Sequence, residues 1–327
     1  MAARPRLKPH ARLLRRGAGA LQVGLAADAG VVLEDLSEAE IALVARLDGS
    51  LDLPGLHAVA VSTGVAPGRV TGLLQALRER HLLLDLPTDR ALLGDLGEVW
   101  RAALRPDADA LAAAYQLAGD GYALLAARRR QHVVVGGTGG LPQSLASLLR
   151  AAGVGRVDVG PAAAEALDLD LRHDPGGDTP TLVVLTAVGA LPSETGEPWR
   201  RRGVAHLPVV AQGHRVLIGP LVTPGHGPCL RCLDLHRCDR DPAWPALLAQ
   251  LALPAPVAPA PAVSPETTLT AIAAGLCAMV VHTALDGQEV PRGVSLEVSL
   301  PWPRVEQRRW TDHPLCGCAV TQATMAR

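Results

Sequence analysis

The stretch that decides the fold reads His132-Val-Val-Val-Gly-Gly-Thr-Gly-Gly140, an apolar run followed at once by a glycine-rich turn. A helical apolar pattern then covers Ser144 to Ala152, and a second short apolar segment runs from Arg156 to Val159. A strand, a glycine turn, a helix and a second strand in this order begin a doubly wound α/β domain. The turn glycines permit positive φ angles and a close approach to the backbone; they are Gly136, Gly137, Gly139 and Gly140.

This glycine turn has two interpretations. In the dinucleotide fingerprint, glycines hold phosphates at the N-terminus of the following helix, and Asp158 stands where a ribose-binding acid would lie. The spacing departs from that fingerprint, because Pro142 occupies the position of its last glycine. The favoured interpretation is a degenerate, structural turn with a strand-end acid. The candidate cofactor-binding residues are Gly136, Gly137, Gly139, Gly140 and Asp158.

The remaining pattern continues as a Rossmann-like α/β domain over residues 131–327. Further strands are predicted at Thr181–Thr186, Val204–Ala211, Val216–Ile218, Val294–Leu300 and Val305–Trp310. A helix is predicted over Leu233–Ala252 with an interruption at Asp241-Pro242, and an apolar helix over Ser264–Leu285. Five prolines between Pro254 and Pro265 predict an extended crossing segment.

Four cysteines form two close pairs, Cys229 with Cys232 and Cys316 with Cys318. Two such pairs supply a closed tetrahedral set of sulfur ligands, which is typical of a structural rather than a catalytic zinc. Disulfides or unrelated buried thiols are the alternatives. The composition favours a cytosolic protein, in which closely spaced cysteines are more often metal-binding than disulfide-bonded.

Several other residues near these pairs have competing interpretations. Cys238 lies among the cations of His236-Arg-Cys-Asp-Arg240, which favour a reactive thiolate, but no base or oxyanion partner is evident and a spare cysteine is the favoured interpretation. Cys277 falls in the apolar helix and is expected to pack as a small hydrophobe. His226 and His313 could each replace a cysteine ligand, yet four thiolates already complete the cage, so both are expected in turns or beside the site.

Composition sets mild bounds. A chain of 327 residues, 48% hydrophobic, suggests about two domains with a substantial core, and a net charge of -1 gives no global field toward nucleic acid or membranes. The longest apolar run, Ile272–Val281, is too short to span a bilayer, and no apolar segment follows the charged N-terminus. We therefore expect a cytoplasmic protein. Lys8 is the only lysine, which disfavours chemistry that needs a lysine to hold phosphates.

Residues 1–90 predict a small mixed module with a winged-helix-like layout. Ser37 begins its first helix, with Glu38 and Glu40 in the favourable first turn. Short apolar segments predict a three-stranded meander at His10–Arg15, Ala20–Leu25 and Gly30–Glu34. Two more helices and a closing strand are predicted at Leu56–Ser62, Pro67–His81 and Leu82–Leu84.

Such a module has three uses. It could insert its third helix into a DNA groove, as Arg69, Arg78 and Arg80 favour, although acidic neighbours such as Asp35 and Glu79 oppose this use. It could instead capture a peptide that adds a strand to an exposed edge and packs against the third helix. A packing module without a ligand is the third interpretation.

Residues 91–130 predict a helical connector. The amphipathic pattern from Asp95 to Arg130 indicates two helices divided near Pro106. The closing Arg128-Arg129-Arg130 fits a solvated helix end that complements the helix dipole.

Four segments together carry a specific resemblance: Ile218-Gly-Pro-Leu-Val-Thr-Pro-Gly225, Pro228-Cys-Leu-Arg-Cys-Leu-Asp-Leu-His236, Asp241-Pro-Ala-Trp244 and His313-Pro-Leu-Cys-Gly-Cys318. With them the chain resembles the cyclodehydratase-associated ThiF-like proteins of thiazole/oxazole-modified peptide biosynthesis. The resemblance covers most of the chain. Its glycine turn is generic, whereas the stretch from Gly-Pro-Leu to Cys-Leu-Arg-Cys is distinctive.

This resemblance implies a PqqD-type winged-helix clamp for the leader of a ribosomal precursor peptide, then a Rossmann-like domain of ThiF/MoeB type with a structural zinc. It implies zinc ligation by Cys229, Cys232, Cys316 and Cys318. It implies peptide contact by Val31, Val32 and Leu33 on the third strand and by Val70, Leu73, Leu74 and Leu77 on the third helix. In such systems a separate YcaO-type partner consumes ATP and forms the azoline. A homodimer through the small residues of the Ser264–Leu285 helix is a weaker expectation than core packing.

The chain departs from active ThiF-like adenylyltransferases. These carry an Asn-x-x-Arg-Gln element, a phosphate-binding lysine and a magnesium-binding acid, whereas Val159–Ala164 and Thr186–Gly189 replace the first and third and the sole lysine is Lys8. Phosphoryl-type chemistry depends on positioned cations around the triphosphate. Arg150 or Arg156 could in principle substitute, but we expect a scaffold that neither binds ATP nor adenylates.

Three functional hypotheses remain. The first is a non-catalytic leader-peptide-binding scaffold that presents a ribosomal precursor to a separate YcaO-type cyclodehydratase. The second is an ATP-dependent adenylyltransferase that activates a peptide or protein C-terminal carboxylate. The third is a winged-helix DNA-binding regulator with a metal-stabilised domain.

Overall fold

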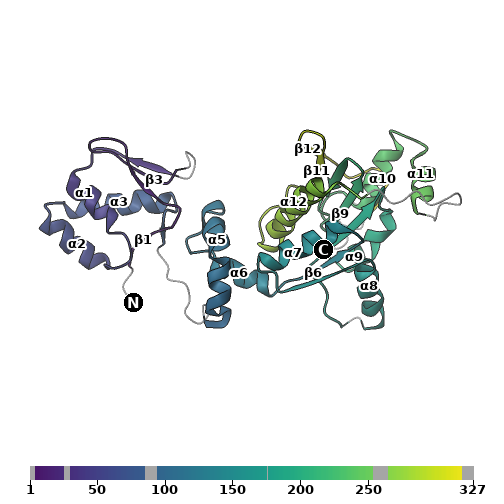
Figure 1. Cartoon of the computed structure of the whole chain (residues 1–327), viewed down its shortest axis with the longest axis horizontal. Helices are drawn as coiled ribbons and strands as arrows, with labels where there is room; N and C mark the ends of the chain where they lie inside the picture. The colour runs from purple at the N-terminus through teal and green to yellow at the C-terminus, as the bar shows by residue number, and fades with distance from the viewer. Residues whose placement is uncertain (1–3, 26–29, 85–93, 175, 253–263, 319–327) are drawn as a thin grey trace. The chain divides into compact units, whose positions relative to one another are not determined.

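The computed structural model describes residues 4–25, 30–84, 94–174, 176–252 and 264–318. The chain divides into two compact units, Met1–Ala126 and Ala127–Arg327, each of which is described by itself (Figure 1). The helices expected in the connector belong to the first unit as far as Ala126.

The second unit is built on a mixed sheet with the strand order β12-β11-β10-β9-β8-β6-β7. The strands β6 to β9 pair in parallel, and β10, β11 and β12 extend one edge as antiparallel strands. Their bounds are β6 His132–Gly136, β7 Arg156–Gly160, β8 Leu182–Val188, β9 Ala205–Gln212, β10 Arg215–Ile218, β11 Val294–Ser299 and β12 Arg304–Arg309. The predicted α/β class is confirmed, and each predicted strand of this unit is present.

Helices cover both faces of this sheet. Within β6, Val133 and Val135 face one buried cluster and Val134 faces the other, because successive side chains of a strand alternate between faces. Each fully buried valine contributes about 2 kcal/mol relative to an exposed one. One face carries α7 Gly140–Ala151 and α12 Thr267–Leu285, and the other carries α8 Ala163–His173, α9 Glu197–Arg201 and α10 Leu230–Cys238.

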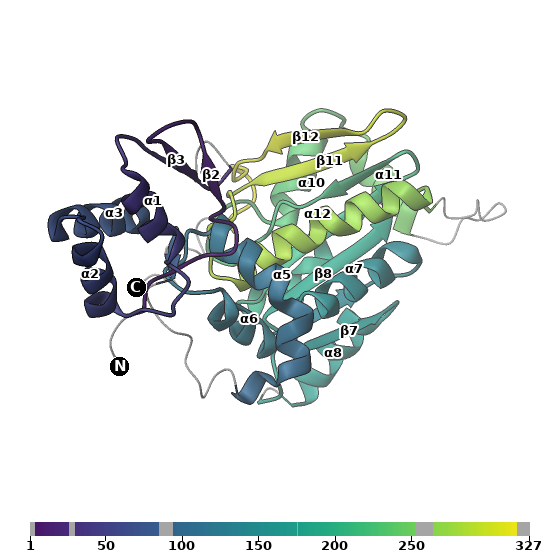
Figure 2. The ribbon, with the colours of Figure 1, turned by 60° about the vertical axis from the view of Figure 1, so that its left-hand side comes forward.

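The helix α12 is long and apolar enough, by length and composition, to cross a membrane. This helix lies along the sheet beside α7 (Figure 2). The same view shows the β11–β12 hairpin at the edge of the sheet opposite β7. The α12 side chains Leu269, Ala273, Cys277 and Val281 are buried in the core between the helices and the sheet. Core packing therefore accounts for its apolar composition.

The predicted interruption at Asp241-Pro242 is confirmed, since it separates α10 from α11 Trp244–Ala252. The apolar helix predicted from Ser264 begins at Thr267, where the Glu266 side chain accepts a hydrogen bond from the Leu269 backbone N–H. The predicted proline-rich crossing segment falls mainly on residues 253–263, outside the described part of the chain.

The first unit contains the predicted meander, with β2, β3 and β4 paired antiparallel in that order. Its first helix begins with a capping box, in which Ser37 and Glu40 each satisfy a backbone N–H of the other. A short pair formed by β1 and β5 closes the module. The bounds are β1 Arg6–Leu7, β2 Leu13–Arg15, β3 Leu21–Val23, β4 Val31–Leu33, α1 Glu38–Ala45, α2 Leu53–Ser62, α3 Pro67–Glu79 and β5 Leu83–Leu84.

The helix division predicted near Pro106 is wrong. Pro106 lies inside α5, which spans Glu98–Ala114, and the chain turns between that helix and α6 Tyr122–Arg129. A proline inside a helix costs about 3 kcal/mol. Burial of Leu104 and Ala108 of α5 against Leu125 of α6 offsets this cost, so tertiary packing overrides the local signal.

Candidate metal centre and glycine-turn cavity

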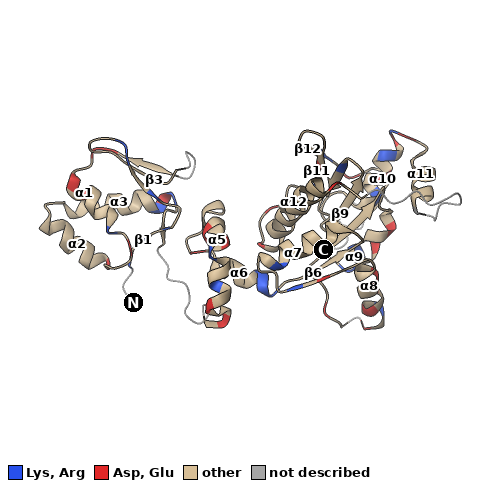
Figure 3. Ribbon diagram, in the orientation of Figure 1, with Lys and Arg blue, Asp and Glu red and all other residues tan. Residues whose placement is uncertain are grey.

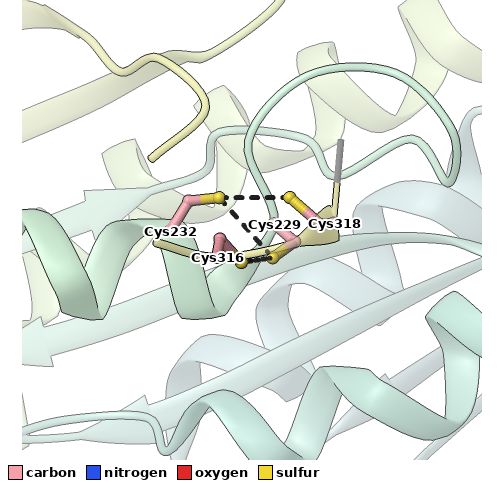
Figure 4. Close-up of side chains that lie close together, drawn as sticks. All are labelled: Cys229, Cys232, Cys316 and Cys318. Atoms are coloured by element: carbon pink, nitrogen blue, oxygen red, sulfur yellow. Dashed lines mark hydrogen bonds between the residues drawn. The ribbon is translucent and has the colours of Figure 1, made fainter. Parts of the chain in front are cut away.

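Four cysteine side chains converge on the face of the sheet that carries α10. Their Sγ atoms lie within 4.8 Å of one another, and Figure 4 shows the sulfurs pointing toward a common centre. The Sγ–Sγ separations are 3.8 Å for Cys229–Cys232, 3.4 Å for Cys229–Cys316 and 3.3 Å for Cys232–Cys318. The structure therefore brings together the four residues predicted as metal ligands.

These separations suit a metal ion better than disulfides. The cysteines are free thiols, and a disulfide would place two sulfurs about 2.05 Å apart. Four thiolates bound tetrahedrally at about 2.3 Å from a zinc ion lie about 3.8 Å from one another. The three observed separations equal this value or fall up to 0.5 Å below it, so the cluster could hold a metal ion with no coordination position left open.

Two local devices deliver the sulfurs. Cys229 is the N-cap residue of α10 and Cys232 lies in its first turn, so both project from the same helix end. On the other side, Gly317 separates Cys316 from Cys318 with a φ of +70°, a left-handed conformation that favours glycine. The Cys316 backbone N–H donates to the carbonyl of His313, which tightens the turn that follows β12.

Electrostatics oppose four neighbouring thiolates unless a cation joins them. The hydrogen bond to Cys232, together with burial, raises the pKa of the Cys229 thiol, and burial raises the pKa of Cys318 to about 12. A divalent ion reverses this preference because a coordinating thiol is deprotonated outright. The donor set therefore fits a thiophilic divalent cation.

A half-open cavity of about 350 Å³ adjoins the cysteines. Arg200 and Glu197 line it and form an ion pair of 2.8 Å, and their hydrogen bond lowers the pKa of Glu197 to about 2. His206 lines it from β9, and burial lowers the pKa of its imidazole to about 4. This region therefore holds fixed charges beside a neutral, buried histidine.

A second group of potential ligands, which the sequence interpretation did not assemble, lies next to the cluster. The side chains of His236, Asp239 and His313 offer ligand atoms within 4.8 Å of one another. The His313 Nδ1 accepts a hydrogen bond from the Leu315 backbone N–H, so its Nε2 carries the proton and donates to Asp239 over 3.0 Å. This arrangement ties α10 to the turn that delivers Cys316. In the sequence, the only sign of this group was the joint occurrence of His236-x-x-Asp239 and His313-Pro314.

The predicted alternatives to the cysteine ligands lie elsewhere. His226 closes a turn by donating its backbone N–H to the carbonyl of Thr223. Cys238 is the last residue of α10 and stands apart from the four clustered sulfurs. Cys277 is fully buried in α12, where desolvation raises the pKa of its thiol.

The glycine turn after β6 is packed against its neighbours. A Cβ at Gly137, whose φ is +128°, would lie 1.8 Å from Oγ1 of Thr186. That hydroxyl donates to the Gly136 carbonyl over 2.8 Å, and the Gly137 N–H donates to the Gly160 carbonyl over 2.9 Å. Close packing of β6 against β7 and β8 therefore requires glycine at position 137 whether or not a ligand binds.

A cavity of about 310 Å³ opens beside the turn, on the face of the sheet that carries α7 and α12. Its described lining is apolar or hydroxylic and includes no charged side chain: Thr138, Gly140, Leu141, Pro142, Ser144, Thr186, Ala187, Val188, Ala211, Ser264, Pro265, Thr267, Thr270 and Ala271. Residues 253–263, which precede Ser264 in the sequence and lie outside the described part, include no Lys or Arg.

The other candidate nucleotide-binding groups are engaged elsewhere and do not line this cavity. Asp158 bonds to His132 over 2.9 Å and to Arg156 over 3.0 Å. Burial raises the pKa of Asp158, but the hydrogen bond from His132 and the positive charge of Arg156 outweigh burial, and the net effect is a lowered pKa. Arg156 also contacts Asp178 at 3.3 Å, and Arg150 donates to the Val157 carbonyl. Lys8 donates through Nζ to the Leu117 carbonyl in the first unit.

The residues predicted to contact a peptide divide into two sets. On the outer strand β4, Val32 is 38% exposed, Val31 is half-buried and Leu33 is buried. The four α3 side chains each lie in the core of the module, with at most 7% exposure: Val70, Leu73, Leu74 and Leu77. As they stand, these α3 side chains hold the helix against the meander and present no free surface.

Comparison by sequence gives no matching protein-family model and no significant match to a curated protein. Comparison by fold gives clear neighbours. A heterocyclase solved in complex with substrate and cofactor matches with a TM-score of 0.65 and 15% identity, over 97% of this chain and 40% of the heterocyclase. The heterocyclase TruD matches with a TM-score of 0.63 and 15% identity, over 97% of this chain and 43% of TruD. This chain thus spans about two fifths of the heterocyclases that it matches.

The E. coli protein MccB matches over nearly the full length of both chains. In its complex with MccA the TM-score is 0.61 at 13% identity, over 96% of this chain and 99% of MccB. The structure of MccB with ATP gives a TM-score of 0.62 at 14% identity. Identities this low establish the fold alone. At that level, the resemblance to ThiF-like proteins expected from the sequence is confirmed.

Proposed function

We propose that this protein is a non-catalytic scaffold that binds the leader of a ribosomal precursor peptide and presents it to a separate YcaO-type cyclodehydratase. The observation that carries the non-catalytic part is the neutral lining of the glycine-turn cavity. An adenylyltransferase must neutralise a triphosphate and its leaving pyrophosphate with positioned cations. Arg150, Arg156 and Lys8, which could have supplied charge, are held by other partners.

The peptide-binding part rests on the first unit as a winged-helix-like module. Its strand β4 is the outer strand of the meander, because it pairs with β3 alone among the strands that the structure describes. An outer strand offers unpaired backbone groups to which an extended peptide can add. The buried side chains of α3 then form the support behind the peptide, and the exposed Val32 takes the direct contact.

The cysteine cluster acts in this proposal as a structural zinc site. Four sulfur donors close the coordination sphere, so the ion would stabilise the second unit without performing chemistry. The supporting fold neighbours include two heterocyclases and MccB solved with MccA. This proposal assigns the cyclodehydratase step to a partner protein in the cytoplasm.

Titration of the full chain with synthetic leader peptides tests the binding role. The peptides are taken from precursors encoded beside its gene, and binding is measured by fluorescence anisotropy. Val32→Asp places a charge on the outer strand and should weaken binding at least about tenfold. Val61→Asp is the matched control, because Val61 is 63% exposed on α2 of the same module and should leave affinity unchanged. Absence of binding by every such peptide contradicts the proposal.

The second candidate, an ATP-dependent adenylyltransferase, is favoured by one observation: MccB has this fold over nearly its whole length and was solved with ATP. ATP–pyrophosphate exchange and ATP binding by calorimetry, measured on the full chain with candidate peptides present, separate the two functions. We expect neither exchange nor ATP binding. Peptide-dependent exchange would establish the adenylyltransferase and overturn the scaffold.

A further inference from the structure

The last strand of the large sheet presents an open edge. β12 occupies the end of the strand order and pairs with β11 alone among the described strands. Each of its six residues, Arg304–Arg309, is exposed. Such an edge carries a row of unpaired backbone N–H and C=O groups, which can accept another strand.

This edge is strongly basic, although charges of both signs are distributed over each unit as a whole (Figure 3). The β12 sequence Arg-Val-Glu-Gln-Arg-Arg carries three arginines and one glutamate. Arg304 pairs with that Glu306 at 2.9 Å, and no carboxylate partner of Arg308 or Arg309 is found in the described part of the chain. The strand therefore has an unneutralised positive charge at its C-terminal half.

A neighbouring helix adds to this charge. Arg308 lies over the ring of Trp310, with its guanidinium carbon 4.5 Å from the ring centroid. Arg237, near the C-terminal end of α10, and Arg240, just beyond that end, approach the same ring at 5.6 and 5.5 Å. Asp234 neutralises Arg237 over 2.9 Å, so of these three arginines at the ring Arg240 and Arg308 have no carboxylate partner among the described residues and can meet an incoming anionic group. Stacking on the indole fixes their positions at little entropic cost.

A second copy of this chain is a poorer occupant of the edge than an acidic strand, because each β12 carries three arginines against one glutamate. In the two-fold symmetric antiparallel register centred on Glu306, Arg304 of one copy would lie opposite Arg308 of the other, and the two Glu306 side chains would face each other. Like charges directly opposite each other destabilise a strand pair. The same arginines favour an acidic strand.

We propose that the β12 edge binds an extended, acidic segment of a partner polypeptide by strand addition. The backbone of the segment pairs with β12. Its acidic side chains face Arg304 and Arg308, with Arg240 alongside, and an apolar side chain faces Val305 on the opposite face of the strand. No residue of the first unit takes part, so this site is independent of the leader-binding role.

The test uses the full chain and a fluorescein-labelled decapeptide of alternating Glu and Val as the probe. We expect saturable binding at peptide concentrations below about 1 mM and protection of residues 304–309 from amide hydrogen exchange. The double variant R304E/R308E should weaken binding at least about tenfold. The variant R46E/R130E, with the same change in charge at two exposed arginines elsewhere, should bind as the parent does.

Two further arms separate strand addition from simple charge attraction and from the leader-binding site. A probe methylated on each internal backbone nitrogen keeps its charge but cannot pair, and it should not bind. The Val32→Asp chain should bind the acidic probe normally, whether or not it loses leader peptides.

Several results would overturn the proposal: no binding, equal binding by the methylated probe or by R304E/R308E, or protection that excludes residues 304–309. A peptide-free dimer, detected by sedimentation, that protects residues 304–309 would assign the edge to a second copy. In the absence of any binding, the arginines serve only to protect a free edge from aggregation.

Discussion

The two faces of the large sheet hold two of the regions that the sequence analysis considered as possible sites, and the faces differ in character. The glycine-turn cavity lies on the α7–α12 face, and its described lining is neutral. The cysteine cluster lies on the α10 face and draws its ligands from residues more than 80 positions apart. A local motif can thus persist for packing reasons alone, whereas four sulfurs that meet in space have few explanations other than a metal.

The largest expected effect on stability is at the cysteine cluster. Cys232→Ser removes a fully buried ligand, and we expect it to abolish stoichiometric zinc binding and destabilise the second unit by about 4 kcal/mol or more. Zinc released on denaturation and the free energy of unfolding in urea measure the two effects. Cys238→Ser is the matched control at the other end of α10 and should change neither. If the parent protein releases no zinc on denaturation, the prediction that the cysteine cluster binds zinc is wrong.

An intermediate effect on the free energy of unfolding is expected at the glycine turn, and it needs no bound ligand. Gly137→Ala introduces a Cβ against Thr186 at a φ of +128°, and we expect a loss of about 3 kcal/mol in the free energy of unfolding. Gly72→Ala in α3, where nothing lies within 4 Å of the new Cβ, should instead gain about 0.5–1 kcal/mol. Adding Thr186→Ala to Gly137→Ala should recover part of the loss. A Gly137→Ala chain as stable as the parent would show that packing does not require this glycine.

The smallest effect comes from the cavity beside the cysteines. Because burial lowers the pKa of His206 to about 4, the unfolded chain takes up a proton near pH 6.5 while the folded chain stays neutral. Stability should therefore fall as the pH drops from 7 through 6.5 toward 4, with about 2 kcal/mol lost by pH 5. His206→Gln should remove this share of the pH dependence. Urea unfolding of both proteins at pH 7 and 5 gives the difference, and equal losses would contradict the assignment.

Local sequence predicted most elements of the fold. The continuous apolar run of Val133–Val135 and the Ser37–Glu40 capping pair act over a few residues, so their structural outcome can be read directly. The helix break predicted at Pro106 was wrong because the local cost of a proline in a helix is offset by the tertiary packing of α5 against α6. The spacing of the cysteine pairs indicated a shared site even though the pairs are far apart in sequence.

Surface and partner assignments depended on the tertiary structure. The predicted peptide-contact residues Val70 and Leu77 proved to be core residues, because a helical apolar stripe has the same spacing whether it faces a core or a ligand. The sequence likewise did not reveal the partners of Asp158. This side chain is held by His132 and Arg156 rather than placed beside the glycine turn.

By itself, the sequence determined the α/β class, the positions of most strands and helices, and the four cysteines that share a site. These depend on periodicity and on ligand chemistry, which are properties of residue types. Only the tertiary structure decided that the glycine-turn cavity is neutral, that Asp239 joins His313 beside the cysteines, and that β12 ends the sheet with its arginines exposed. Those facts depend on which distant segments become neighbours, and the order of strands in a sheet is fixed by the packing of the whole unit.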